Sequence, residues 1–197
     1  MSTTEFASAD LTIGQVNAIV KKLGGHDAAL RFLRGELTVT EPMFPIWKTI
    51  KLGTYKDVKS LREGLEKNGF RNGDWSADVG TKPAFTLATE EATINLVNVS
   101  VGELGFTKAT PLRDICTRAI VLGLKSCPAE VGPQLRLQYP DQPLGQWVHV
   151  AMEAITDSGS GPYAFGVGRN SFGRHLSTHW SNPDNTLFPG DRLIFCQ

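Results

Sequence analysis

The stretch from Trp147 to Gly168 constrains the fold of this chain more than any other part of the sequence. It holds two runs rich in β-branched and aromatic residues, Trp147–Glu153 and Tyr163–Val167, separated by the polar segment Asp157–Gly161. Such runs on either side of a turn are typical of neighbouring strands in a hairpin. The C-terminal half of the chain is therefore predicted to contain a sheet.

Hydrophobic periodicity and turn residues predict helices and strands in irregular alternation along the chain. Helices are expected at 12–23, 27–34, 55–68, 111–122 and 130–138, and strands at 46–51, 94–101 and 191–196. Residues 174–180 fit either a strand or a helix. Because the elements lack a regular βαβα rhythm, the predicted class is α+β, with a mixed or mostly antiparallel sheet and packed helices.

The first 40 residues are predicted to form an N-terminal helical hairpin, and residues 41–197 an α+β core domain. Thr12 and Gln15 have the spacing of a capping box, and Asp27 is expected to cap the second helix. The hairpin is similar in outline to a helix-turn-helix. Its second helix, however, opens with Asp27-Ala28-Ala29-Leu30, whereas a recognition helix offers polar side chains to the base edges. Packing or protein contact is the preferred interpretation.

Composition argues for a folded chain without an obvious polyanionic partner. The sequence is 41% hydrophobic, and its 20 Lys and Arg residues balance 20 Asp and Glu residues. No apolar run approaches the roughly 18 residues that a membrane-spanning helix needs. The opening residues lack the basic and apolar regions of a signal peptide. We therefore expect a soluble, cytoplasmic protein.

The cysteines suggest neither a disulfide framework nor a metal site. There are three of them, Cys116, Cys127 and Cys196, and they form no Cys-x-x-Cys pair. Cys116 falls on the apolar face of a predicted helix, where a thiol is usually an inert small hydrophobe. Cys127, in a predicted loop, is the one thiol whose reactivity we would test.

A basic helix surface is the first candidate binding site. In the predicted helix 55–68, the basic side chains lie off the apolar stripe that faces the core; they are Lys56, Lys59, Arg62 and Lys67. They would contact a protein partner or, in a nucleic-acid complex, the phosphate groups. A solvated helix face is the alternative interpretation.

His175, His179 and Asp184 form the candidate metal site of an alternative function, a small metal-dependent hydrolase. On a helix the two histidines would share one face and could bind zinc, with Asp184 as a third ligand. On a strand they would lie about 13 Å apart, too far for one metal ion. Exposed or packing histidines are the competing interpretation.

Four further polar residues, His149, Glu153, Arg169 and Arg174, are candidates for lining a polar cleft on the predicted sheet. The alternative is that they lie on its solvent face. No cofactor is predicted, because Gly166-Val167-Gly168-Arg169 lacks the third glycine of a dinucleotide fingerprint. The segment 157–161 likewise lacks the Gly-Lys-Ser/Thr ending of a phosphate-binding loop, and no catalytic residue is proposed.

Several blocks of the sequence resemble an uncharacterised family of small bacterial proteins that are frequent in candidate-phyla genomes. The blocks are Leu11–Ala18, Lys22–Gly25, Phe32–Leu37, Leu65–Phe70 and Met152–Gly159. The resemblance implies an intracellular bacterial accessory protein and no particular chemistry. The first hypothesis is therefore a binding or interaction protein of unknown ligand, with nucleic-acid association as one version, and an enzyme is disfavoured.

Overall fold

The computed structural model describes residues 11–38, 44–72 and 78–197, and the chain divides into two compact units, Met1–Pro42 and Met43–Gln197. The first unit contains α1 (Ile13–Leu23) and α2 (His26–Leu33). Thr12 and Gln15 form the predicted capping box, and Gly24 ends α1 in the left-handed conformation, at φ 103°. The predicted cap of α2 was wrong. Gly25 occupies that position, and Asp27 lies in the first turn, where a carboxylate is favoured by the helix dipole.

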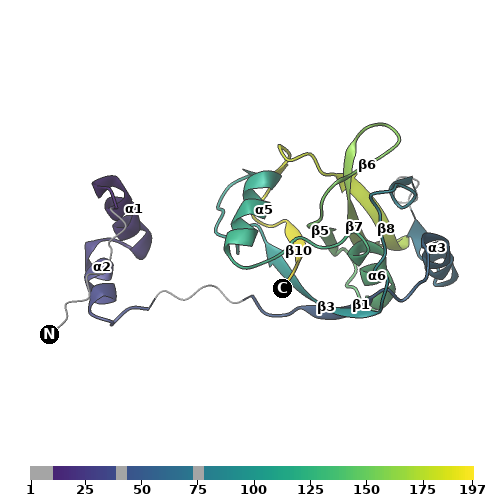
Figure 1. Cartoon of the computed structure of the whole chain (residues 1–197), viewed down its shortest axis with the longest axis horizontal. Coiled ribbons are helices and arrows are strands. Elements are labelled where there is room, and N and C mark those ends of the chain that lie inside the picture. Colours follow the sequence, from purple (N-terminus) through teal and green to yellow (C-terminus); the bar gives the residue numbers. More distant parts are fainter. Residues whose placement is uncertain (1–10, 39–43, 73–77) are drawn as a thin grey trace. The chain divides into compact units, whose positions relative to one another are not determined.

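The second unit is built on one mixed sheet with the strand order β1-β3-β10-β5-β7-β8-β2 (Figure 1). β5 and β2 run parallel to β10 and β8 respectively, and the other pairs are antiparallel. The strands along this path are β1 (Lys48–Leu52), β3 (Ala92–Ser100), β10 (Arg192–Cys196), β5 (Trp147–Val150), β7 (Pro162–Asn170), β8 (Gly173–Trp180) and β2 (Arg71–Asn72).

Three shorter strands complete the described strand pairings. β6 (Ile155–Thr156) pairs with β7 across the segment 157–161. The two runs predicted to be neighbouring strands lie in β5 and β7, which pair antiparallel. β4 (Thr110–Pro111) and β9 (Thr186–Leu187) form a separate two-stranded sheet. The α+β class and mixed sheet predicted from the sequence are thereby confirmed, and the ambiguous residues 174–180 belong to strand β8.

Both faces of the sheet are covered, and β10 shows how its residues alternate between them. Ile194 and Cys196 belong to one hydrophobic cluster, and Leu193 and Phe195 to the other. The first cluster packs beneath α3 (Val58–Lys67) and α6 (Val131–Gln138), and the second beneath α5 (Leu112–Val121). A strand buried on both faces reads as a continuous apolar run, as Leu-Ile-Phe-Cys does here.

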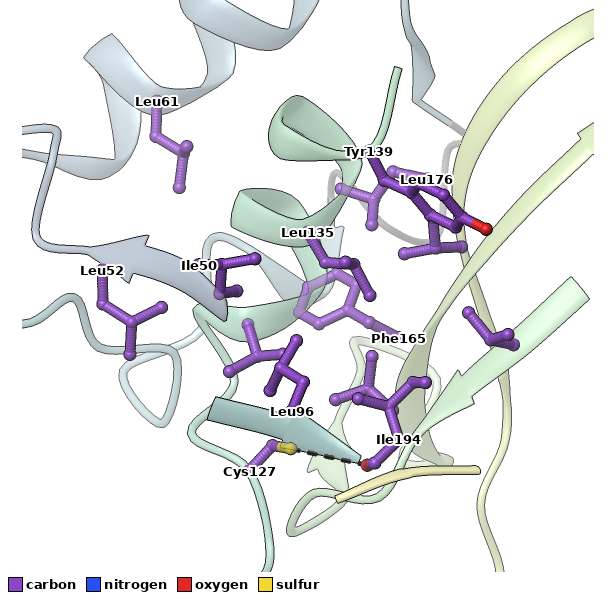
Figure 2. Packing of buried hydrophobic residues seen from close by; sticks show 14 of the residues in the cluster. Ile50, Leu52, Leu61, Leu96, Cys127, Leu135, Tyr139, Phe165, Leu176 and Ile194 are labelled. Atoms are coloured by element: carbon purple, nitrogen blue, oxygen red, sulfur yellow. Dashed lines mark hydrogen bonds between the residues drawn. The ribbon is translucent and has the colours of Figure 1, made fainter. Parts of the chain in front are cut away.

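Helix α6 packs unusually close to the sheet. Figure 2 shows Leu135 of α6 beside Ile50 and above Leu96 and Phe165. The approach depends on Gly132, because a Cβ atom there would lie 2.5 Å from Cβ of Phe165. Close packing of this kind leaves no room for a larger side chain without displacement of the helix.

Three polar side chains at four-residue spacing, Glu130, Gln134 and Gln138, join α6 to β1 and the loops beside it. Glu130 accepts hydrogen bonds from the backbone N–H groups of Gly53 and Ala88, at 2.8 and 2.7 Å. Gln138 both accepts from and donates to the backbone of Lys51, at 2.8 Å in each case. The outer edge of β1 is therefore satisfied by a side chain, where an edge strand otherwise presents unpaired backbone groups.

No helix in the described part of the chain is long and apolar enough to cross a bilayer.

Candidate functional site

An open cleft of about 270 Å³ lies between α3 and the segment 80–85. We call it the α3 cleft. Its apolar surface comes from α3, α6, β7 and β8, and two basic side chains of α3 lie at its edge. The residues that line it are Val58, Lys59, Leu61, Arg62, Leu65, Gly80, Thr81, Phe85, Pro133, Phe165 and Leu176.

The apolar wall of the α3 cleft is rigid because it is part of the hydrophobic core. Leu61 and Leu65 are buried on the inner stripe of α3, and Leu61 is seen pointing toward the core in Figure 2. Phe85 packs edge-on against Phe165, with ring centroids 5.8 Å apart. Aromatic and aliphatic walls of this kind bind the apolar part of a small molecule.

Lys59 and Arg62 give the edge of the cleft its positive charge. Each is paired with a carboxylate one turn further along the helix: Lys59 with Glu63 at 3.9 Å, and Arg62 with Glu66 at 3.2 Å. The side chains of Lys59 and Arg62 are 87% and 56% exposed. Because exposed pairs of this type contribute little to stability, both cations can turn toward an anionic ligand at small cost.

The opposite wall of the cleft is held by a cluster of Asp78, Lys82 and Ser158. Asp78 accepts hydrogen bonds from the backbone N–H and the hydroxyl of Ser158, both at 2.8 Å, and pairs with Lys82 at 2.9 Å. The hydrogen bonds from Ser158, with those from Lys82, lower the pKa of Asp78 to about 2. The cluster fastens the segment that carries Gly80 and Thr81 to the hairpin between β6 and β7.

Sequence reasoning did not find this cluster. Asp78 and Ser158 are 80 residues apart, and neither lies in a recognisable motif. Ser158 donates its hydroxyl proton to a carboxylate and accepts from an ammonium group, at 2.5 Å. Each polar group therefore has its partner within the cluster. This arrangement indicates that the cluster links two segments of the chain and that Ser158 is not an activated nucleophile.

The four basic residues predicted as a binding surface are divided between two hollows and the segment before α3. Lys59 and Arg62 line the α3 cleft, whereas Lys67 lines a separate depression with Tyr55 and Glu63. Lys56 lies before the first residue of the helix. Over residues 56–67, these four cations are offset by three carboxylates, so four minus three leaves a net charge of +1.

The four residues predicted to share a polar cleft divide among three environments, one of which is common to Arg169 and Arg174. Glu153 lines a second cavity of about 390 Å³, together with Cys127. Arg169 and Arg174 face each other across β7 and β8 and donate to the carbonyls of Gln142 and Pro140, at 2.7 and 2.8 Å. They therefore stabilise the loop that follows α6.

A third guanidinium lies buried beside these two. Arg136 donates to the side chain of Gln142 and to the backbone carbonyls of Gly168 and Tyr139, and it stacks on the ring of Phe70. Burial, followed by repulsion from Arg174, lowers its pKa to about 10. Its hydrogen bonds go to neutral oxygens of the loop and of β7, so its role is structural.

His149 meets a different partner, the imidazole of His179. The two ring centroids are 4.3 Å apart, although His149 lies on β5 and His179 on β8, with β7 between them. Both Nδ1 atoms are buried without a hydrogen-bond partner among the described residues. Burial lowers the pKa of His149, and burial together with His149 lowers the pKa of His179 to about 3.

The residues of the predicted metal site are not brought together. His175 and His179 lie four residues apart on β8, which corresponds to about 13 Å along a strand. Nε2 of His175 is hydrogen-bonded to Oδ1 of Asn170 at 2.7 Å, and Asp184 forms an ion pair with Arg113. Within the described ranges, no group of three or more His, Cys, Asp or Glu side chains could hold a metal ion.

No protein-family model, no curated protein and no solved structure matches this chain, so the site is interpreted from its own geometry.

Proposed function

We propose that this chain is a binding protein whose ligand occupies the α3 cleft and carries an apolar body with an anionic group. The observation that carries the proposal is the combination of a mostly apolar wall with Lys59 and Arg62 at its edge. Ligand sites commonly join a hydrophobic surface to a few polar groups that fix orientation. The cleft is small, at about 270 Å³, which suits a medium-chain carboxylate better than a polymer.

The distribution of charge favours this ligand over nucleic acid. A phosphate backbone is bound by several cations arranged along one surface. Here the four basic side chains of residues 56–67 are divided between two depressions and are largely offset by neighbouring carboxylates. If all four contacted duplex phosphates, the logarithm of the association constant would fall with the logarithm of salt concentration at a slope of about −3.6. A mobility-shift titration that gave this slope would favour nucleic acid instead.

The metal-dependent hydrolase receives no support from the positions of His175, His179 and Asp184. Metal analysis of the purified chain, followed by the His175→Ala variant in an activity screen, remains its direct test. Stoichiometric zinc lost in that variant would restore the enzyme hypothesis.

Binding of octanoate and of octanol, measured by isothermal titration calorimetry, tests the proposed ligand class. The double variant Lys59→Ala/Arg62→Ala should weaken octanoate binding by about two- to fivefold for each cation removed, because exposed charge contacts are individually modest. Octanol binding should change little, since it has no charge. Lys56→Ala/Lys67→Ala is the matched control, because it removes the same charge outside the cleft.

The variant Thr81→Trp tests whether the ligand binds in the α3 cleft. An indole placed at the exposed Thr81 fills the cleft without altering the core, and it should abolish binding of both ligands. Unchanged octanoate affinity in this variant, or no octanoate binding by the original chain, would refute the proposal.

A further inference from the structure

Two of the three cysteines are in direct contact, although they are 69 residues apart in the sequence. The Sγ atoms of Cys127 and Cys196 are 3.0 Å apart, and both residues are buried. Cys127 lies in the segment before α6, and Cys196 lies near the end of β10. Figure 2 shows Cys127 below Leu96, with its Sγ 3.4 Å from the carbonyl oxygen of Ile194.

The backbone holds both cysteines in place. Cys196 and Lys125 exchange two backbone hydrogen bonds, at 2.7 and 2.8 Å, and the N–H of Cys127 donates to the carbonyl of Ala151 at 2.7 Å. The main chain of Cys196 is therefore held in β10, and that of Cys127 is held against the residue that follows β5. The sulfurs of a disulfide lie about 2.05 Å apart, so bond formation requires them to approach by about 1 Å.

We propose that Cys127 and Cys196 form a redox-active pair that a peroxide oxidises to an intramolecular disulfide. The proposal stands on the contact of the two sulfurs and on a route for the oxidant. Cys127 lines the cavity of about 390 Å³ that also contains Glu153, and this volume admits hydrogen peroxide.

The oxidation proceeds in two balanced steps. The sulfur of Cys127 attacks one oxygen of hydrogen peroxide; the O–O bond breaks, and sulfenic acid and water are formed. The sulfur of Cys196 then attacks that of Cys127, the S–O bond breaks, and the hydroxyl leaves as a second water after taking up the thiol proton. Two thiols have lost two electrons, and the peroxide has gained them.

The environment of Cys127 sets the rate at which its thiol reacts with peroxide. Burial raises the pKa of the Cys127 thiol well above its usual value, and the thiolate is the nucleophile. Oxidation is therefore slow at neutral pH and becomes faster as the pH rises. The raised pKa distinguishes Cys127 from the low-pKa cysteines of fast peroxide sensors, whereas the contact with Cys127 lowers the pKa of Cys196.

The bond would join β10, which lies between β3 and β5, to the segment that leads into α6. Closing a loop of this length restricts the unfolded chain, and the melting temperature should rise by about 10 °C. The fold itself changes little, because both partners are already in contact.

The test uses the full chain in its original sequence. After exposure to hydrogen peroxide, the chain is denatured and treated with iodoacetamide, and its intact mass and tryptic peptides are measured. We expect alkylation of a single thiol, that of Cys116. Before alkylation, the oxidised chain should be 2 Da lighter than the reduced chain. The tryptic digest should contain a cross-linked pair of peptides that carry Cys127 and Cys196. Dithiothreitol should restore three alkylated thiols and the lower melting temperature.

Cys116→Ser should form the same cross-link, whereas Cys196→Ser should stop at sulfenic acid, which a dimedone probe detects. Three alkylated thiols after prolonged peroxide exposure at pH 9 would overturn the proposal. So would a cross-link that includes Cys116. These readouts do not depend on any ligand, so they succeed or fail independently of the α3 cleft.

Discussion

The imidazoles of His149 and His179, which meet edge to face, should make the second unit sensitive to mild acid. The pKa of His179 is lowered to about 3 in the folded chain, whereas an imidazole in the unfolded chain has its ordinary pKa of 6.5. Between these values the unfolded chain binds a proton that the folded chain does not. The stability contributed by a neutral His179 is therefore present above pH 6.5 and is lost progressively as the pH falls toward 3.

The size of the effect follows from linkage. Each pH unit below 6.5 lowers the free energy of unfolding by about 1.4 kcal/mol for one such group, so acidification from pH 8 to pH 5 should cost about 2 kcal/mol through His179 alone. His149 acts in the same direction, because burial also lowers its pKa, although Asp191 opposes that shift. Carboxylates contribute little in this window, since their ordinary pKa values lie below it.

Urea denaturation at pH 8 and pH 5, followed by tryptophan fluorescence, measures this difference. All four tryptophans fall within residues 43–197, so the signal reports on the second unit. Between pH 8 and pH 5, the free energy of unfolding should fall by about 2 kcal/mol less in His179→Gln than in the original chain. His26→Gln, exposed on α2 in the first unit, is the matched control. If His179→Gln loses as much stability on acidification as the original chain does, the imidazole pair does not cause the acid sensitivity.

Three further predictions concern the packing of α6 and the wall of the α3 cleft. Gly132→Ala should lower the free energy of unfolding by about 1–3 kcal/mol, because its new methyl group meets Phe165, and an unchanged urea midpoint would contradict the packing. Asp78→Asn should weaken octanoate binding by loosening its hold on Ser158 and Lys82, whereas equal affinity would show that the cluster does not support the cleft. Because the pKa of Asp78 is lowered to about 2, its stabilisation is present above pH 3.8 and is lost as the pH falls toward 2; stability measured from pH 5 to pH 2 should therefore decline less steeply in Asp78→Asn.

Local signals in the sequence were sufficient for most of the secondary structure. The capping box of Thr12 and Gln15 and the amphipathic stripe of α3 depend on residues three or four positions apart, so the sequence displays them directly. The apolar run that became β10 is equally local. Residues 174–180 were ambiguous because pairing with β7, and not local propensity, makes them a strand.

The sequence by itself determined the α+β class and most of the longer helices and strands, because periodicity and capping are short-range properties of a chain. Only the tertiary structure decided which polar groups meet. Asp78 contacts Ser158, Cys127 contacts Cys196, and His149 contacts His179 across a strand that lies between them. Each contact joins residues from different strands or loops, and strand order and register place them together. No spacing within a single element encodes that arrangement.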